Sequence, residues 1–204
     1  MDTEARRRQQ KKAMEETQLD LAHTINCMLL PDRFHLLDRL PKDASVAEVG
    51  VAFGEFTREI LNRCAPEKLF LIDSWDSARF RDGLGAIEQE YAPNIASGQV
   101  EIRLGKSVDV LRNMAGGAFD WAYIDTSHTY ETTLAELQLS GDIVGDDGRI
   151  AGHDFCTGNV VRPVPYGVVE AVTKFCKDCD WQFEYLTAES NGHFSFCLKR
   201  LGSP

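Results

Sequence analysis

Two segments of the sequence bring together acidic and histidine side chains that could take part in acid–base or metal chemistry. In the first, His128 follows Asp125 by three residues, and in the second His153 directly precedes Asp154. A histidine imidazole has an ordinary pKa of about 6.5, so it can remove a proton from a hydroxyl group near neutral pH. A divalent cation held by carboxylates lowers the pKa of a hydroxyl group bound to it. These residue types therefore suit acid–base or metal-assisted chemistry.

The histidine at position 153 affects which metal ion such a site would bind. Mg²⁺ prefers oxygen ligands, whereas an imidazole nitrogen favours ions such as Mn²⁺ or Zn²⁺. The sequence leaves three alternatives open: a weakened Mg²⁺ site, a site for a different ion, or a site without metal.

A glycine-containing loop is the third candidate region. Gly50 and Gly54 stand four residues apart and follow Glu48, a spacing that lets the backbone turn sharply and approach a ligand closely. The loop is not the dinucleotide fingerprint G-x-G-x-x-G, because Ala52 and Glu55 occupy the places of its second and third glycines. A carboxylate at the start of the following helix would also repel a pyrophosphate. The loop therefore favours a ligand with cationic groups.

Short apolar runs that alternate with amphipathic stretches must position these residues. The runs predicted as parallel strands cover residues 45–49, 68–72, 100–104, 119–124 and 148–152. Two further runs, 181–186 and 193–198, are too close for a crossover helix, so they must form an antiparallel hairpin. The pattern predicts an α/β fold with a doubly wound, mostly parallel sheet of seven strands and one antiparallel strand near an edge.

The candidate residues share one end of this predicted sheet. Gly50, Asp73 and Asp125 each directly follow a predicted strand, and Asp154 follows the fifth strand after His153. Ligands of doubly wound sheets bind beyond the carboxyl ends of the strands. We therefore expect these side chains to line one binding site.

The loop from Glu48 to Gly54, with the pattern E-x-G-x-x-x-G, resembles the first motif of class I S-adenosylmethionine-dependent methyltransferases. Asp73 stands where that family has an acceptor for ribose hydroxyls, and residues 104–107 stand where it contacts the adenosine. This resemblance covers residues 45–199. Segments 123–131 and 148–154 are similar to the branch that contains the macrolide-sugar O-methyltransferases and cephalosporin-hydroxylase-like proteins.

The resemblance implies a cofactor, a metal and a set of site residues. The cofactor would be S-adenosylmethionine, whose sulfonium and ammonium groups suit an acidic loop. Its implied contacts are Glu48, Gly50, Phe53, Gly54, Asp73, Ser74, Gly105, Ser107 and Asp125. The resemblance also implies that Asp125, Asp154 and His153 hold a divalent metal ion, Mg²⁺ or Mn²⁺. His128 would be the general base, with Asp125 as the second catalytic residue.

These implications favour an enzyme that transfers a methyl group from S-adenosylmethionine to a hydroxyl group of a small molecule. One alternative is a noncatalytic protein that binds S-adenosylmethionine or a protein partner. The other is an NAD(P)-dependent reductase, which the glycine spacing disfavours. Because Asp125, His128 and Asp154 are all present, the enzyme is the favoured interpretation.

Composition and charge exclude several other classes. The 204 residues suit one domain of ordinary size, and no apolar run approaches the roughly 18 residues of a membrane span. With 22 basic and 32 acidic residues the net charge is −10, which would repel nucleic-acid phosphates. We expect a cytoplasmic protein with a small-molecule substrate and with no nucleic-acid or membrane partner, since the sequence shows no secretory leader.

One cysteine pattern nearly matches the spacing of a structural zinc site. It consists of Cys176, Cys179, His193 and Cys197. The first two cysteines fall at the end of an amphipathic helix, and the run between the pairs has the pattern of a core strand. We therefore expect buried thiols here instead of zinc ligands.

Residues 1–44 are expected to form a helical N-terminal extension, and residues 45–204 the methyltransferase-like domain. The extension is predicted as helices from Gln18 to Leu30 and from Phe34 to Leu40, and it could act as a lid or as a homodimer contact. The loop from Phe155 to Pro165 carries Arg162, which could contact an anionic substrate or face solvent.

Overall fold

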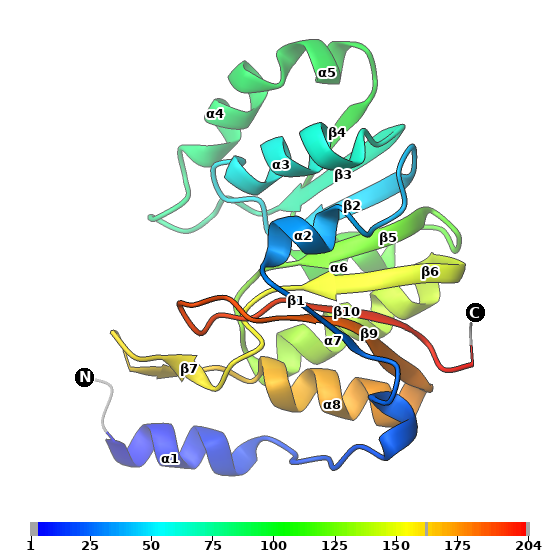
Figure 1. Cartoon of the computed structure of the whole chain (residues 1–204). Helices are drawn as coiled ribbons and strands as arrows, with labels where there is room; N and C mark the ends of the chain where they lie inside the picture. The colour runs from blue at the N-terminus through cyan, green and yellow to red at the C-terminus, as the bar shows by residue number, and fades with distance from the viewer. Residues whose placement is uncertain (1–3, 162, 203–204) are drawn as a thin grey trace.

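The computed structural model describes residues 4–161 and 163–202, so Arg162 lies outside the described residues. In this part of the chain, eight strands form one sheet in the order β1-β9-β10-β6-β5-β2-β3-β4 (Figure 1). The strands are β1 (Met28–Leu30), β2 (Ser45–Val49), β3 (Lys68–Asp73), β4 (Val100–Leu104), β5 (Phe119–Ile124), β6 (Val144–Gly152), β9 (Trp181–Thr187) and β10 (Phe196–Arg200). A separate small hairpin consists of β7 (Gly158–Asn159) and β8 (Val164–Pro165).

The predicted α/β architecture is confirmed. All seven predicted strands are present, and β10 runs antiparallel to both of its neighbours, β9 and β6. The other neighbouring strands of the main sheet pair in parallel. The eighth strand, β1, comes from the N-terminal extension. Because β9 and β1 lie outside β10, the reversed strand is inside the sheet and not at its edge.

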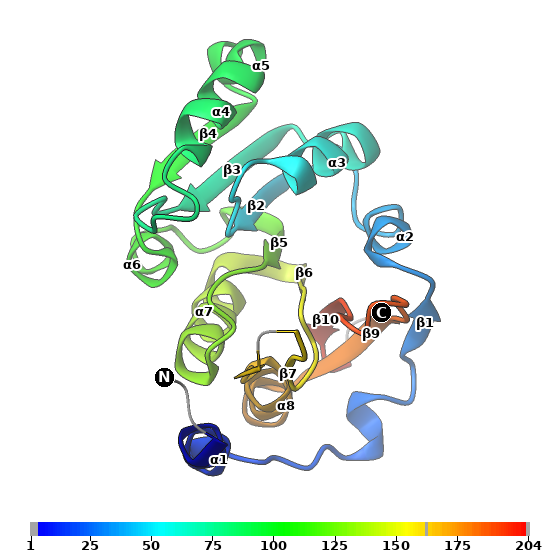
Figure 2. The same cartoon turned by 90° about the vertical axis from the view of Figure 1, so that its left-hand side faces the viewer.

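Helices cover both faces of the sheet. The helices are α1 (Glu4–Ala13), α2 (Arg33–Leu37), α3 (Glu55–Cys64), α4 (Gly83–Glu90), α5 (Ala92–Ala96), α6 (Ser107–Arg112), α7 (Tyr130–Ile143) and α8 (Val168–Cys179). Figure 2 shows α2 and α3 on one side of the sheet and α6 and α7 on the other. Each face has its own core: Leu36 and Ile60 belong to one, and Leu137 and Val172 belong to the other. Strands buried on both faces, such as β2, suit the parallel part of this arrangement.

The N-terminal extension differs from its prediction. A helix over Gln18 to Leu30 is wrong: a 3-10 turn covers Leu21–His23, and Met28–Leu30 forms β1, which pairs in parallel with β9. The second predicted helix is shortened to α2. Pairing with β1 satisfies backbone groups that β9 would otherwise expose at the sheet edge. The extension therefore contributes one strand, β1, to the main sheet.

Salt bridges hold the first helix and the segment after it against α8. Lys11 pairs with Glu170, and Lys174 pairs with Glu15 at 3.0 Å. Over the described residues, no helix has both the length and the apolar character that crossing a bilayer requires.

Candidate active site

A cleft of about 1040 Å³ opens at the carboxyl ends of β2, β3, β5 and β6. It is lined by every site residue that the sequence predicts, except Gly54 and Gly105. The structure thus brings the glycine loop, the end of β3 and the two acid–histidine segments to one cavity, as expected for the carboxyl end of a doubly wound sheet.

Gly50 and Gly54 are needed where they stand. Both have left-handed backbone angles, with φ of 91° and 84°. A Cβ atom at Gly50 would lie 2.0 Å from the carbonyl oxygen of Asp125, and one at Gly54 would lie 2.4 Å from Ile87 Cδ1. The absent side chains let β2 and α3 pack closely against the end of β5 and against α4. Gly54 therefore shapes the loop by packing against α4, although it does not line the cleft itself.

Asp73 holds the glycine loop in shape. Its Oδ2 accepts hydrogen bonds from the backbone N–H groups of Val51 at 2.8 Å and Ala52 at 3.0 Å. Its Oδ1 accepts one from Trp75 N–H at 3.0 Å, and the Trp75 indole donates to the Ala52 carbonyl at 2.7 Å. Since each carboxylate oxygen has two lone pairs, Oδ1 retains capacity for a ligand hydroxyl.

Glu48 does not supply the negative charge that the acidic loop suggested. It is 1% exposed, and burial raises the pKa of its carboxyl group to about 8, although the hydrogen bond from Thr57 lowers it. The Glu48 side chain is therefore mostly protonated at neutral pH. The negative charge of the cleft comes from other carboxylates, Asp125 and Asp154 among them.

Asp125, His128 and Asp154, here called the triad, meet at the His128 ring. His128 Nε2 lies 3.0 Å from Asp125 Oδ1 and 2.9 Å from Asp154 Oδ2. Burial lowers the pKa of His128, but the hydrogen bonds to the two carboxylates outweigh this effect and raise the pKa to about 9. The imidazole also stacks on Tyr166, with ring centroids 4.6 Å apart. The triad therefore holds a charged imidazolium between two carboxylates.

Backbone conformation contributes to this arrangement. His128 and Asp154 have φ of 60° and 57°, in the left-handed region that non-glycine residues rarely adopt. Such strained residues cluster at functional sites, where the surrounding structure holds them in place.

His153, the third predicted metal ligand, lies close to both carboxylates. Its Nδ1 is 3.8 Å from Asp125 Oδ2 and 3.6 Å from Asp154 Oδ1. The groups around these carboxylates do not fit an oxygen-ligated ion such as Mg²⁺, because His128 bonds to both carboxylates and the other side chains beside them, His153 and His193, offer imidazole nitrogens. The family's implied Mg²⁺ therefore has no oxygen-only ligand set here.

Sequence reasoning did not place one residue of the cleft, His193, or two residues behind its lining, Cys156 and Glu136. His193, in the loop before β10, hydrogen-bonds through Nδ1 to Asp154 Oδ1, and Cys156 Sγ lies 3.8 Å from the same nitrogen. Glu136 on α7 is buried and accepts hydrogen bonds from Ser107 at 2.5 Å and Thr126 at 2.8 Å. A polar residue within the helical apolar pattern was the available signal for Glu136. Local spacing associated His193 with Cys176, Cys179 and Cys197, and gave no sign of its contact with Asp154.

Comparison with known proteins gives the same class as the fold and the cleft. The family model described as "Methyltransferase domain" matches residues 47–155, a little over half of the chain. The chain belongs to this family of S-adenosylmethionine-dependent methyltransferase domains and is a methyltransferase. No curated protein matches the chain in sequence.

Solved structures share the fold at low sequence identity. A putative rRNA methylase from Clostridium thermocellum has a TM-score of 0.62 and 12% identity, over 84% of this chain and 95% of that one. SMU.1697c, a putative methyltransferase from Streptococcus mutans solved in complex with SAH, has a TM-score of 0.60 and 14% identity, over 83% and 96%. The pyocyanin biosynthetic protein PhzM has a TM-score of 0.57 and 18% identity, over 82% of this chain and 54% of that one. This chain thus spans about half the length of PhzM.

Proposed function

We propose that this protein transfers the methyl group of S-adenosylmethionine to a hydroxyl group of a small molecule in the cytoplasm. One observation carries the proposal: the glycine loop with Asp73 and the triad line the same cleft. The first part suits the nucleoside of the cofactor, and the second suits deprotonation of an acceptor beside it.

Methyl transfer is a displacement at carbon, so the enzyme must align the acceptor and remove its proton. Holding two reactants in line contributes several kcal/mol. His128 is the proposed base, and Asp125 is the residue that orients it. With a pKa of about 9, only about 1% of His128 is neutral at pH 7. An acceptor that displaces one carboxylate from His128 would increase the neutral fraction.

A small molecule is the acceptor class that the charge supports. The net charge of −10 disfavours binding to a nucleic-acid backbone, although the fold is shared with a putative rRNA methylase. Assays with a panel of sugars and phenols, beside one with ribosomal RNA, would separate these substrate classes. Methylation of RNA alone would contradict the proposal.

Calorimetry tests the cofactor assignment. We expect heat of binding with S-adenosylmethionine and none with NAD⁺. Binding of NAD⁺ alone would favour a reductase. Binding of S-adenosylmethionine without turnover on any acceptor would favour a noncatalytic binding protein.

His128→Ala tests the base. We expect cofactor affinity near the wild-type value and turnover reduced by about 10²–10⁴-fold, since a positioned base contributes about that much. His35→Ala is the matched control, because His35 is exposed and hydrogen-bonds only to Asp32 among its described contacts. Unchanged turnover in His128→Ala would show that the base is another group.

A further inference from the structure

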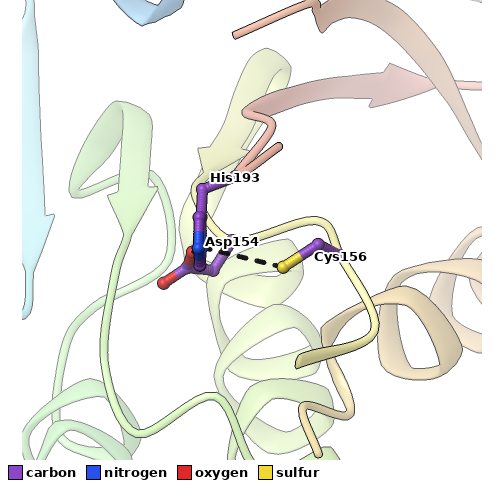
Figure 3. A group of neighbouring side chains, drawn as sticks. All are labelled: Asp154, Cys156 and His193. Atoms are coloured by element: carbon purple, nitrogen blue, oxygen red, sulfur yellow. Dashed lines mark hydrogen bonds and ion pairs between the residues drawn. The ribbon is translucent and has the colours of Figure 1, made fainter. Parts of the chain in front are cut away.

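A second group of potential metal ligands lies directly beside the triad. Asp154, Cys156 and His193 each place one donor atom within 4.8 Å of the other two. The donors are a carboxylate oxygen, a thiol sulfur and an imidazole nitrogen. Figure 3 shows the His193 ring directed at the Asp154 carboxylate, with the Cys156 sulfur facing the same nitrogen. Three types of donor therefore converge on one point.

The backbone fixes these side chains from two segments of the chain. Phe155 N–H donates to the Phe194 carbonyl at 2.9 Å, which joins the loop after β6 to the loop before β10. The Phe155 ring packs against Phe183 and Phe196, with centroid distances of 5.5 and 6.0 Å. Because Phe155 is anchored in the core, its neighbours Asp154 and Cys156 are held beside His193.

The two oxygens of Asp154 have separate partners. Oδ2 pairs with His128 at 2.9 Å, whereas Oδ1 is the oxygen that faces His193. A metal ion on Oδ1 would therefore leave the contact with His128 in place. A hydrogen bond to a ligating carboxylate is the usual outer-shell support of a metal site.

We propose that Asp154, Cys156 and His193 form a binding site for a transition-metal ion, with Zn²⁺ as the ion that fits best. A mixed set of nitrogen, oxygen and sulfur donors selects Zn²⁺ over Mg²⁺. Tetrahedral Zn²⁺ bonds of about 2.3 Å to sulfur and about 2.0 Å to nitrogen place those two atoms about 3.5 Å apart. The observed separation of Cys156 Sγ and His193 Nδ1 is 3.8 Å.

Ion binding replaces the hydrogen bond between His193 and Asp154 and removes the thiol proton of Cys156. Three protein ligands leave a fourth position for water or for an acceptor. Asp154 and His193 both line the cleft, so that position is on the cleft side. The site does not depend on methyl transfer, and its failure would leave the proposed function intact.

Titration of the purified protein with Co²⁺, a spectroscopic substitute for Zn²⁺, tests the site. We expect saturation at one equivalent, a thiolate-to-cobalt charge-transfer band and the intense visible bands of a four-coordinate ion. Zn²⁺ should displace the Co²⁺, and a large excess of Mg²⁺ should not. Cys156→Ser should abolish the charge-transfer band, and His193→Gln should weaken Co²⁺ binding by at least about tenfold.

Cys179→Ser is the matched control, because Cys179 is an exposed thiol outside the described ligand groups. It should keep the wild-type spectrum. Far-UV circular dichroism checks that each variant folds, and Cys156→Ala replaces Cys156→Ser if the serine variant does not. Two results with the wild type would overturn the proposal: a spectrum without a thiolate band, or displacement of Co²⁺ by Mg²⁺. Two results with the variants would also overturn it: a thiolate band that survives the loss of Cys156, or one that is lost in Cys179→Ser.

Discussion

Asp154 contacts histidines from two different parts of the cleft. It is 7% exposed, and its carboxylate contacts His128 through one oxygen and His193 through the other. Burial raises the pKa of Asp154, but its interactions with the His128 and His153 imidazoles outweigh this effect and lower the pKa far below its usual range. The carboxylate is therefore ionised at neutral pH and holds imidazoles from separate parts of the chain.

Glu48 gives a pH-dependent prediction at the residue scale. The pKa of Glu48 is about 8 in the folded protein, against an ordinary value of 4.5. At a pH between about 4.5 and about 8, the Glu48 carboxyl is ionised in the unfolded chain but neutral in the folded one. The folded wild type therefore loses stability as the pH rises through this range. Thr57 and Arg33 lower this pKa, and Asp73 and Asp125 raise it. Glu48→Gln should be more stable than wild type by about 1–3 kcal/mol near pH 8, and less so near pH 5.

Urea unfolding at several pH values measures this difference. Glu67→Gln, at an exposed position, is the control and should change stability by less than about 0.5 kcal/mol. A Glu48→Gln effect that is the same at every pH would mean that burial does not hold this carboxyl in its neutral form.

Sequence reasoning predicted part of the site at this scale. Asp125 and His128 are three residues apart, and His153 and Asp154 are adjacent, so local spacing was enough to place them at strand ends. The partnership of Cys156 with His193 could not be predicted, because it joins two loops through the packing of Phe155. Local patterning paired His193 with other cysteines instead. Cys176 and Cys197 are buried as expected, whereas Cys179 is exposed.

At the scale of elements, the pairing of β1 with β9 gives a second prediction. Leu30 is 6% exposed and Leu29 is 65% exposed, so the two neighbours differ in burial while sharing one strand. Leu30→Ala should lower the free energy of unfolding by about 2–4 kcal/mol, because it removes buried methyl groups.

Leu29→Ala is the matched control and should cost less than about 0.5 kcal/mol in the same denaturation experiment. Equal effects of the two substitutions would contradict the placement of β1 at the sheet.

The strands of the main domain were predictable because each is a short run of continuous or alternating apolar residues of ordinary strand length. The helix expected over Gln18 to Leu30 was wrong for a physical reason. Leu21 and Ile25 are 70% and 64% exposed, so this segment does not bury the apolar face that would stabilise an amphipathic helix. The structure of this segment is set by β9, far away in the sequence, and local propensity gives no information about such a partner.

At the scale of the whole molecule, cofactor binding should stabilise the fold. A ligand that binds only the folded state at about 100 times its Kd adds about 2.7 kcal/mol. For a chain of this length that corresponds to roughly 5–10 °C in Tm. We expect this shift with S-adenosylmethionine in a thermal unfolding experiment. NAD⁺ is the control, and an equal shift with NAD⁺ would contradict a selective cofactor site.

The reversed direction of β10 has a consequence for how the site is assembled. Because β10 is antiparallel to β6, the beginning of β10 lies beside the end of β6, and the loop before β10 reaches the cleft. The glycine loop and Asp73 come from the first half of the chain, whereas His193 comes from near its end. Two distant parts of the chain thus meet in one cleft, and the bonds from Phe155 to Phe194 and from His193 to Asp154 fix the late loop to the end of β6.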